Sequence, residues 1–100
     1  MDSISMNLAV AVKPITRTLL MFELKIIPNF EFVDLPINVV VEDRDTVDTE
    51  VVQSQFFFIL KKQYVGETTT LNFPVAIHGS LPREFIVEIH NFLHCFIGHP

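Results

Sequence analysis

The class of fold that the sequence predicts depends on residues 82–97, PREFIVEIHNFLHCFI. Large apolar residues recur there at steps of three and four, the spacing of one face of an α-helix. They are Phe85, Ile86, Ile89, Phe92, Leu93, Phe96 and Ile97. Pro82 suits the first turn of a helix and Gly98 suits its end. The stretch therefore predicts one C-terminal amphipathic helix over residues 82–97.

Residues 6–78 are rich in segments of strand length. Large apolar residues fall on every second position in several of them, which is typical of strands with one buried face. The predicted strands lie at residues 6–12, 18–26, 37–41, 51–65 and 71–77. Pro74 cannot donate a hydrogen bond to a neighbouring strand, so the last of these strands is expected to lie at a sheet edge or to bulge at Pro74.

Together these patterns predict an α+β fold. We expect an antiparallel β-sheet of about five strands, curled toward a sandwich or half-barrel and packed on one face by the C-terminal helix. A chain of 100 residues has the length of one domain, so residues 1–100 are expected to form a single domain.

The composition indicates more apolar side chain than a monomer of this size needs. Apolar residues make up 49% of the chain and charged residues 19%, against roughly a quarter charged in an average soluble domain. One helix covers only one face of a sheet, so the other face is expected to lie against a partner. The composition therefore predicts a homo-oligomer, with contact to another protein as the alternative.

The predicted interface centres on three consecutive phenylalanines. Neighbouring strand residues point to opposite faces, so the strand that carries them is apolar on both sides. The second predicted strand also carries apolar residues on its other face. The predicted interface residues are Phe56, Phe57, Phe58, Ile59, Leu19 and Met21.

The sequence also bears on nucleic acid and membranes as partners and on the compartment of the protein. The net charge is −5, and Lys61 and Lys62 are the only adjacent cationic pair, so nucleic acid is not expected as a partner. The apolar run at residues 56–60 is far too short to span a membrane, and no membrane partner is expected. A single cysteine, Cys95, fits a reducing compartment and predicts a cytoplasmic protein.

Two histidines are the candidates for a metal site. His90 and His94 lie one turn apart on the predicted helix, a spacing that lets two imidazoles reach one ion. The glutamate of a zinc protease helix is missing between them, so boundary histidines without metal or cofactor are predicted. Cys95 is adjacent to His94, and adjacent helix residues do not face each other, so a buried or boundary thiol is expected.

An acidic segment follows the third predicted strand. Its carboxylates are Glu42, Asp43, Asp45, Asp48 and Glu50, and Arg44 lies among them. The spacing lacks the glycine and the closing glutamate of an EF-hand loop. A solvated hairpin loop without a specific calcium site is therefore expected.

No catalytic or nucleotide-binding motif is present, so the sequence predicts a protein that is not an enzyme. The predicted function is an oligomerising interaction module that works through apolar sheet surface. The alternatives are a chaperone-like or adaptor protein that binds other chains, a carrier with an apolar pocket lined by phenylalanines, and a metal-dependent enzyme built on His90 and His94.

Overall fold

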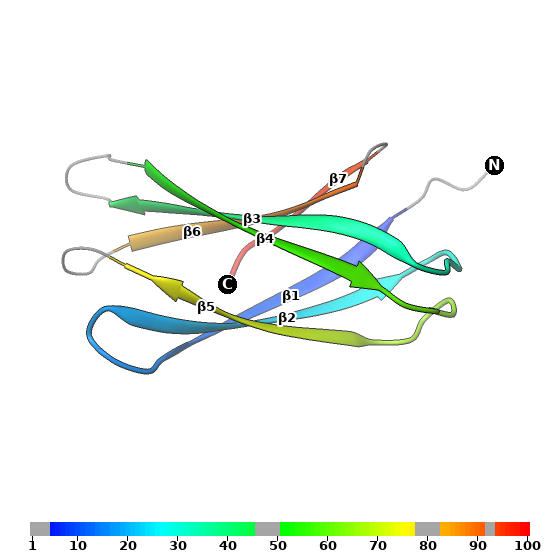
Figure 1. The fold of residues 1–100 in the computed structure, drawn as a ribbon, viewed down its shortest axis with the longest axis horizontal. Coiled ribbons are helices and arrows are strands. Elements are labelled where there is room, and N and C mark those ends of the chain that lie inside the picture. Colours follow the sequence, from blue (N-terminus) through cyan, green and yellow to red (C-terminus); the bar gives the residue numbers. More distant parts are fainter. Residues whose placement is uncertain (1–4, 46–50, 78–82, 92–93) are drawn as a thin grey trace.

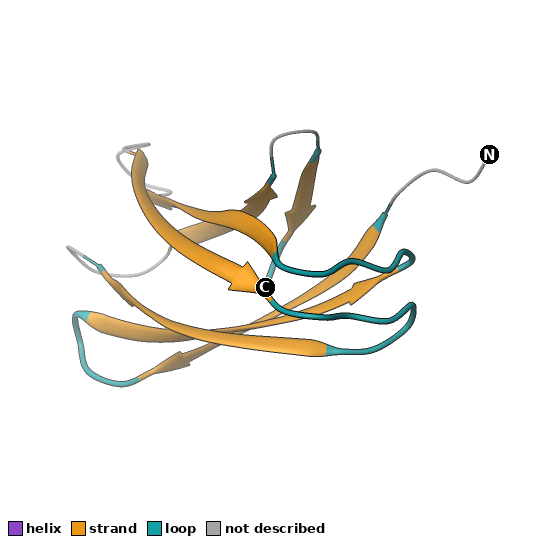
Figure 2. Cartoon of the chain, turned by 45° about the vertical axis from the view of Figure 1, so that its right-hand side comes forward, coloured by secondary structure: helices purple, strands orange, loops and turns teal. Residues whose placement is uncertain are grey.

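The structure is a computed structural model that describes residues 5–45, 51–77, 83–91 and 94–100. All regular secondary structure in this part of the chain is β-strand, as Figure 2 shows. The seven strands are β1 (Met6–Pro14), β2 (Leu19–Pro28), β3 (Leu35–Asp45), β4 (Val51–Leu60), β5 (Thr69–Ala76), β6 (Arg83–His90) and β7 (Cys95–Gly98).

The strands form two antiparallel sheets that lie face to face (Figure 1). One sheet has the order β1-β2-β5 and the other has the order β4-β3-β6-β7. This arrangement is an immunoglobulin-like β-sandwich in which β4 pairs with β3. The chain has no tryptophan and one cysteine, so it lacks the disulfide packed on tryptophan that marks antibody domains.

Phenylalanines fill the space between the two sheets. Phe73 of β5 packs its ring against Phe22 of β2 at 5.7 Å and against Phe56 of β4 at 4.7 Å between centroids. Phe85 of β6 meets Phe22 edge to face at 5.2 Å. These rings belong to strands of both sheets, so they join the two layers into one core. The carrier alternative placed a pocket lined by phenylalanines beneath a helix, whereas these rings pack against one another between the two sheets.

The predicted α+β fold is wrong, because the stretch expected to be a helix forms two strands. β6 pairs with β3, and β7 pairs with β6, both antiparallel. Phe85, Val87 and Ile89 point toward the core at every second position, as in a strand. Ile86 is also apolar but lies on the opposite face, so the alternation is not visible in the sequence. Phe92 and Leu93 of the predicted stripe lie outside the described residues.

The earlier strands follow the alternating pattern more closely. β1 and β2 lie where alternation predicts them, and β5 is an edge strand as Pro74 indicates. The acidic segment differs from its prediction, because β3 extends through residues 42–45 of the expected loop. Residues 46–50, with Asp48 and Glu50, lie outside the described part.

Asp43 of that segment is buried inside the sandwich. Arg83 Nη1 donates to both carboxylate oxygens of Asp43 at 2.7 Å. The two side chains are only 5% and 6% exposed. An ion pair of this kind is stable in the interior only when each charge keeps its partner. The ion pair joins β3 to the first residue of β6.

Candidate functional site

The outer face of the four-stranded sheet is the candidate functional surface. The register places alternate residues of β3, β4, β6 and β7 on this face, away from the first sheet. We call this set the outer face: Pro36, Asn38, Val40, Glu42, Arg44, Val51, Gln53, Gln55, Phe57, Ile59, Glu84, Ile86, Glu88, His90, Cys95 and Ile97.

Large apolar side chains stand exposed at both edges of the outer face. On β4, Phe57 is 65% exposed and Ile59 is 50% exposed. On β7, Ile97 is 60% exposed. Isolated exposed apolar residues are common, but two on one strand of a sheet face are typical of a surface that contacts another protein.

A shallow hollow of about 310 Å³ lies beside Phe57 at one end of the outer face. Pro36, Asn38, His90 and Asn91 line it together with Phe57. Asn38 lies opposite His90 on one side and opposite Phe57 on the other. The hollow therefore joins an exposed aromatic ring to hydrogen-bonding side chains.

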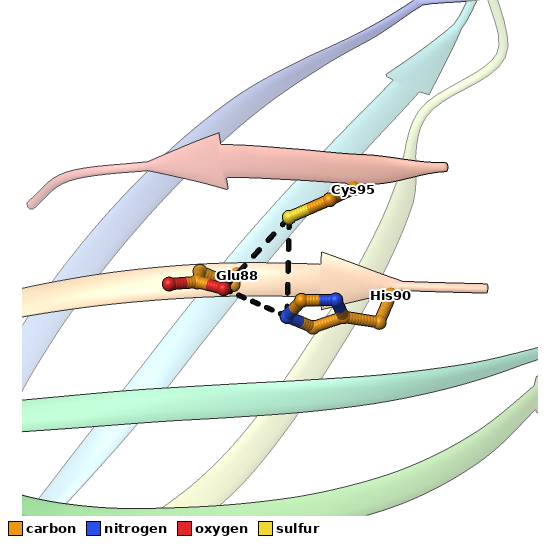
Figure 3. Close-up of side chains that lie close together, drawn as sticks. All are labelled: Glu88, His90 and Cys95. Carbon is orange, nitrogen blue, oxygen red and sulfur yellow. Dashed lines mark hydrogen bonds and ion pairs between the residues drawn. The ribbon is translucent and has the colours of Figure 1, made fainter. Parts of the chain in front are cut away.

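A cluster of three chemically active side chains lies on the same face, where β6 meets β7 (Figure 3). His90 Nε2 is 2.7 Å from Glu88 Oε2, and Cys95 Sγ is 3.8 Å from that oxygen and 3.9 Å from His90 Nε2. Glu88 and His90 are two residues apart on one strand, and Cys95 lies directly opposite His90. We call Glu88, His90 and Cys95 the triad.

Asn91 fixes the hairpin end that holds the triad. Its backbone N–H donates to the carbonyl oxygen of His94 at 3.1 Å, and its side-chain oxygen accepts from the His94 N–H at 2.7 Å. Asparagine favours turns because its side chain forms such local hydrogen bonds. This turn sets the β6–β7 register and so brings Cys95 opposite His90.

The triad keeps the cysteine in its neutral form. Cys95 is exposed, so the expectation of a buried or boundary thiol is wrong. The slight desolvation that it keeps raises the pKa of the Cys95 thiol, and the charge and hydrogen bond of Glu88 raise it further. A thiol is a poor nucleophile until it loses its proton. The arrangement is therefore better suited to binding a ligand that displaces the proton than to nucleophilic attack.

The structure separates the six predicted interface residues. Phe57 and Ile59 lie on the outer face, while Phe56 and Phe58 point inward and pack against the core. Leu19 and Met21 are half-buried on the far side of the other sheet. These six residues therefore form no single surface, and only Phe57 and Ile59 belong to the candidate site.

The histidines predicted as weak metal candidates are also separated. His90 belongs to the triad, whereas the His94 ring stacks on Phe96 with centroids 6.0 Å apart. The sequence did not predict Glu88 or Cys95 as site residues, because both were assigned to a helix. The available signal was the two-residue step from Glu88 to His90, which puts both on one face of a strand.

No helix in the described part of the chain is long and apolar enough to cross a membrane.

Comparison with known proteins gives one family. The family model described as "Sec63 Brl domain" matches residues 4–95. Among curated proteins, a DExH-box ATP-dependent RNA helicase of Arabidopsis thaliana, DExH12, is 38% identical over 90 residues, which is 83% of this chain. The U5 small nuclear ribonucleoprotein 200 kDa helicase of Homo sapiens is 31% identical over 91 residues, 84% of this chain.

Activating signal cointegrator 1 complex subunit 3 of Bos taurus is 30% identical over 90 residues, 84% of this chain. The chain spans about 4% of the length of each of these relatives. The similarity is therefore to one small region of a much larger protein.

These matches correct three predictions. The self-assembling module and its chaperone, carrier and metalloenzyme alternatives are wrong, because the matched region belongs to proteins named as helicases. The predicted homo-oligomer is wrong as well, because the match is to one region of proteins named as helicases and not to a self-assembling module. The exclusion of nucleic acid is also wrong, because a relative is named as an RNA helicase.

Proposed function

The chain belongs to the Sec63 Brl domain family, and we propose from this that it is a non-catalytic β-sandwich domain of a larger RNA helicase. In this proposal the ATP-driven reaction belongs to the rest of that protein. The domain contributes by docking its outer face onto the helicase region, which it thereby helps to hold in place.

The exposed apolar edge of the outer face carries this proposal. Phe57 and Ile59 stand on β4, an edge strand, where a neighbouring domain can reach both the side chains and the free edge of the backbone. An unpartnered apolar edge strand invites non-specific pairing unless something covers it. The relatives extend far beyond the matched region, so a covering domain is available in the same polypeptide.

Charge on the outer face indicates the chemistry of the docking partner. Glu42, Glu84 and Glu88 lie among its described residues, and Arg44 is the only lysine or arginine there. Complementary potentials favour a partner that surrounds apolar groups with basic ones. We therefore expect the contacting helicase surface to present an apolar patch flanked by lysine or arginine.

Location follows from the same proposal. RNA helicases act inside cells, so an intracellular site is expected for this domain. The cytoplasm, predicted from the single cysteine, remains a prediction, and one relative is named as part of a small nuclear ribonucleoprotein.

Site-specific photo-crosslinking tests the docking. A benzophenone amino acid replaces Phe57 in the full-length protein, and a second protein carries it at Ile15 of the β1–β2 connection, which is 50% exposed like Ile59. After irradiation, mass spectrometry identifies the peptides joined to each position. We expect position 57 to join to one segment of the helicase region and position 15 to give no such product.

Two outcomes would overturn the proposal. One is that position 57 joins to RNA and not to protein. The other is that positions 57 and 15 give the same scattered set of products, which would mean that the outer face has no fixed partner.

Direct RNA contact at the connection between β4 and β5 is the second candidate function. Lys62 Nζ lies 4.8 Å from the centroid of the exposed Tyr64 ring, and Lys61 is adjacent. Lysines beside an exposed aromatic ring are typical of surfaces that bind single-stranded nucleic acid. In the full-length protein, Lys61→Glu with Lys62→Glu should weaken RNA binding several-fold.

The control for the RNA candidate is Lys13→Glu with Lys25→Glu, which makes the same charge change on β1 and β2. RNA affinity is measured by fluorescence anisotropy for both proteins. Equal affinities for the two double variants would remove this candidate.

A further inference from the structure

We propose that the triad of Glu88, His90 and Cys95 binds one zinc ion, with water as the fourth ligand. The triad belongs to the outer face, but the zinc proposal does not depend on docking, because it rests on the three donor atoms alone. The observation that carries the inference is the convergence of three different ligand atoms on one side of the β6–β7 hairpin (Figure 3).

The distances between the ligand atoms fit a tetrahedral metal site. Zn–S bonds of about 2.3 Å and Zn–N or Zn–O bonds of about 2.0–2.1 Å put neighbouring ligand atoms roughly 3.3–3.6 Å apart. Cys95 Sγ lies 3.8 Å from Glu88 Oε2 and 3.9 Å from His90 Nε2. The sulfur therefore needs to move only by a few tenths of an ångström.

The contact between Glu88 and His90 would change when the ion enters. Their atoms are 2.7 Å apart, which is a hydrogen-bond distance and shorter than the separation of two ligands on one zinc ion. Both side chains are partly exposed, at 24% for Glu88 and 39% for His90, so a small rotation of each is open to them. Metal binding replaces this hydrogen bond with two bonds to the ion.

The chemical nature of the donors favours zinc. A thiolate, an imidazole nitrogen and a carboxylate oxygen are all established zinc ligands, whereas calcium and magnesium prefer oxygen alone. The Cys95 thiol releases its proton to solvent when its sulfur binds the ion, and His90 binds through Nε2 with its own proton on Nδ1. Three protein ligands leave one position for water.

The backbone holds the three donors close together before metal arrives. Glu88 and His90 share the outer face of β6, and the hairpin register fixes Cys95 opposite His90. Val87 and Ile89, the two neighbours of Glu88 on β6, are fully buried and hold the strand in the core. A site on such a strand pair loses less conformational freedom on binding than one on a loop.

Zinc binding is tested on the full chain by isothermal titration calorimetry, with circular dichroism to confirm that each variant stays folded. We expect one zinc ion per chain. Cys95→Ser and His90→Gln should each weaken binding at least tenfold, and Glu88→Gln should weaken it less. The control His99→Gln removes a histidine outside the triad and should leave the affinity unchanged.

Cobalt supplies an independent readout, because a bond from thiolate to Co²⁺ gives a charge-transfer absorption band. The band should appear in the unchanged chain and in His99→Gln, and it should be missing in Cys95→Ser. Absence of saturable zinc binding would overturn the proposal. So would an equal loss of affinity in His99→Gln, or a cobalt band that survives in Cys95→Ser.

Discussion

The ion pair between Asp43 and Arg83 lies inside the sandwich, where each charge depends on the other. Replacing Arg83 with Leu leaves a buried carboxylate without its partner, and the expected loss of unfolding free energy is about 3–5 kcal/mol. Removing both charges, with Asp43→Leu and Arg83→Leu, should restore much of this loss, because no uncompensated charge remains. Urea unfolding of the two variants measures the difference.

The conservative variant Asp43→Asn is the companion to this experiment, since it keeps the shape and removes the negative charge. It should be destabilised as well, because Arg83 then lacks its counter-charge. A loss below about 1 kcal/mol in Arg83→Leu would contradict a buried pair and would be typical of a surface one.

Gly98 of β7 packs against β1. A Cβ at this position would be 3.1 Å from Leu8 Cβ and 3.3 Å from Val10 Cγ2, both closer than ordinary contact. Gly98→Val should therefore cost about 1–3 kcal/mol through overpacking. Thermal unfolding measures the loss, and Ile97→Val at the exposed neighbouring position should change stability by less than about 0.5 kcal/mol.

A second substitution separates overpacking from other causes. Leu8→Ala makes room beside residue 98, so Gly98→Val combined with Leu8→Ala should cost less than the sum of the two single changes. Strict additivity would mean that Leu8 and residue 98 do not touch.

At the scale of elements, the introduction of one cysteine distinguishes the β6–β7 hairpin from a helix. Residues directly opposite in antiparallel strands have Cα atoms about 4.5–5.5 Å apart, within the reach of a disulfide. His90→Cys should therefore form an intramolecular disulfide with Cys95 on mild oxidation. Loss of free thiol and an unchanged monomer mass on a non-reducing gel would report it.

Asn91→Cys is the matched control for the hairpin test. Residues 91 and 95 are four apart, so they would be neighbours on a helix, whereas in the hairpin Asn91 is paired with His94. The hairpin predicts a disulfide in His90→Cys only. A disulfide in Asn91→Cys and none in His90→Cys would indicate a helix.

Sequence patterns predicted those strands that have one polar face. In β1, small or polar residues separate the buried or half-buried Met6, Leu8 and Val10, and the period of two is visible directly. β6 was missed because Ile86 and the core-facing Phe85 and Val87 are consecutive apolar residues, which fit a helical stripe equally well. Pairing with β3 settles the choice, and that contact is not visible in the local pattern.

The candidate site was less predictable than the strands. The apolar character of residues 56–59 was visible, but the division between core and surface depends on the β3–β4 register. Cys95 and His90 are five residues apart, so only a hairpin brings their side chains together. The triad therefore follows from the strand pairing and not from a motif.

At the scale of the whole molecule, we propose that the two sheets unfold together, as expected for one domain. Phe73 touches rings of both sheets, so removing it weakens both layers. Phe73→Ala should cost about 3–5 kcal/mol, and urea unfolding should remain a single transition. Tyrosine fluorescence and circular dichroism should give the same midpoint, and separate midpoints would contradict a common core.

The docking of the outer face is the central claim, and hydrogen exchange in the full-length protein tests it most directly. In Phe57→Asp with Ile59→Asp, exposed charges replace the apolar contacts, so amides of residues 51–60 should exchange faster than in the unchanged protein. The control Ile15→Asp, at a position 50% exposed, should leave these amides unchanged. Equal exchange of residues 51–60 in all three proteins would show that the outer face is not covered, and it would contradict the account.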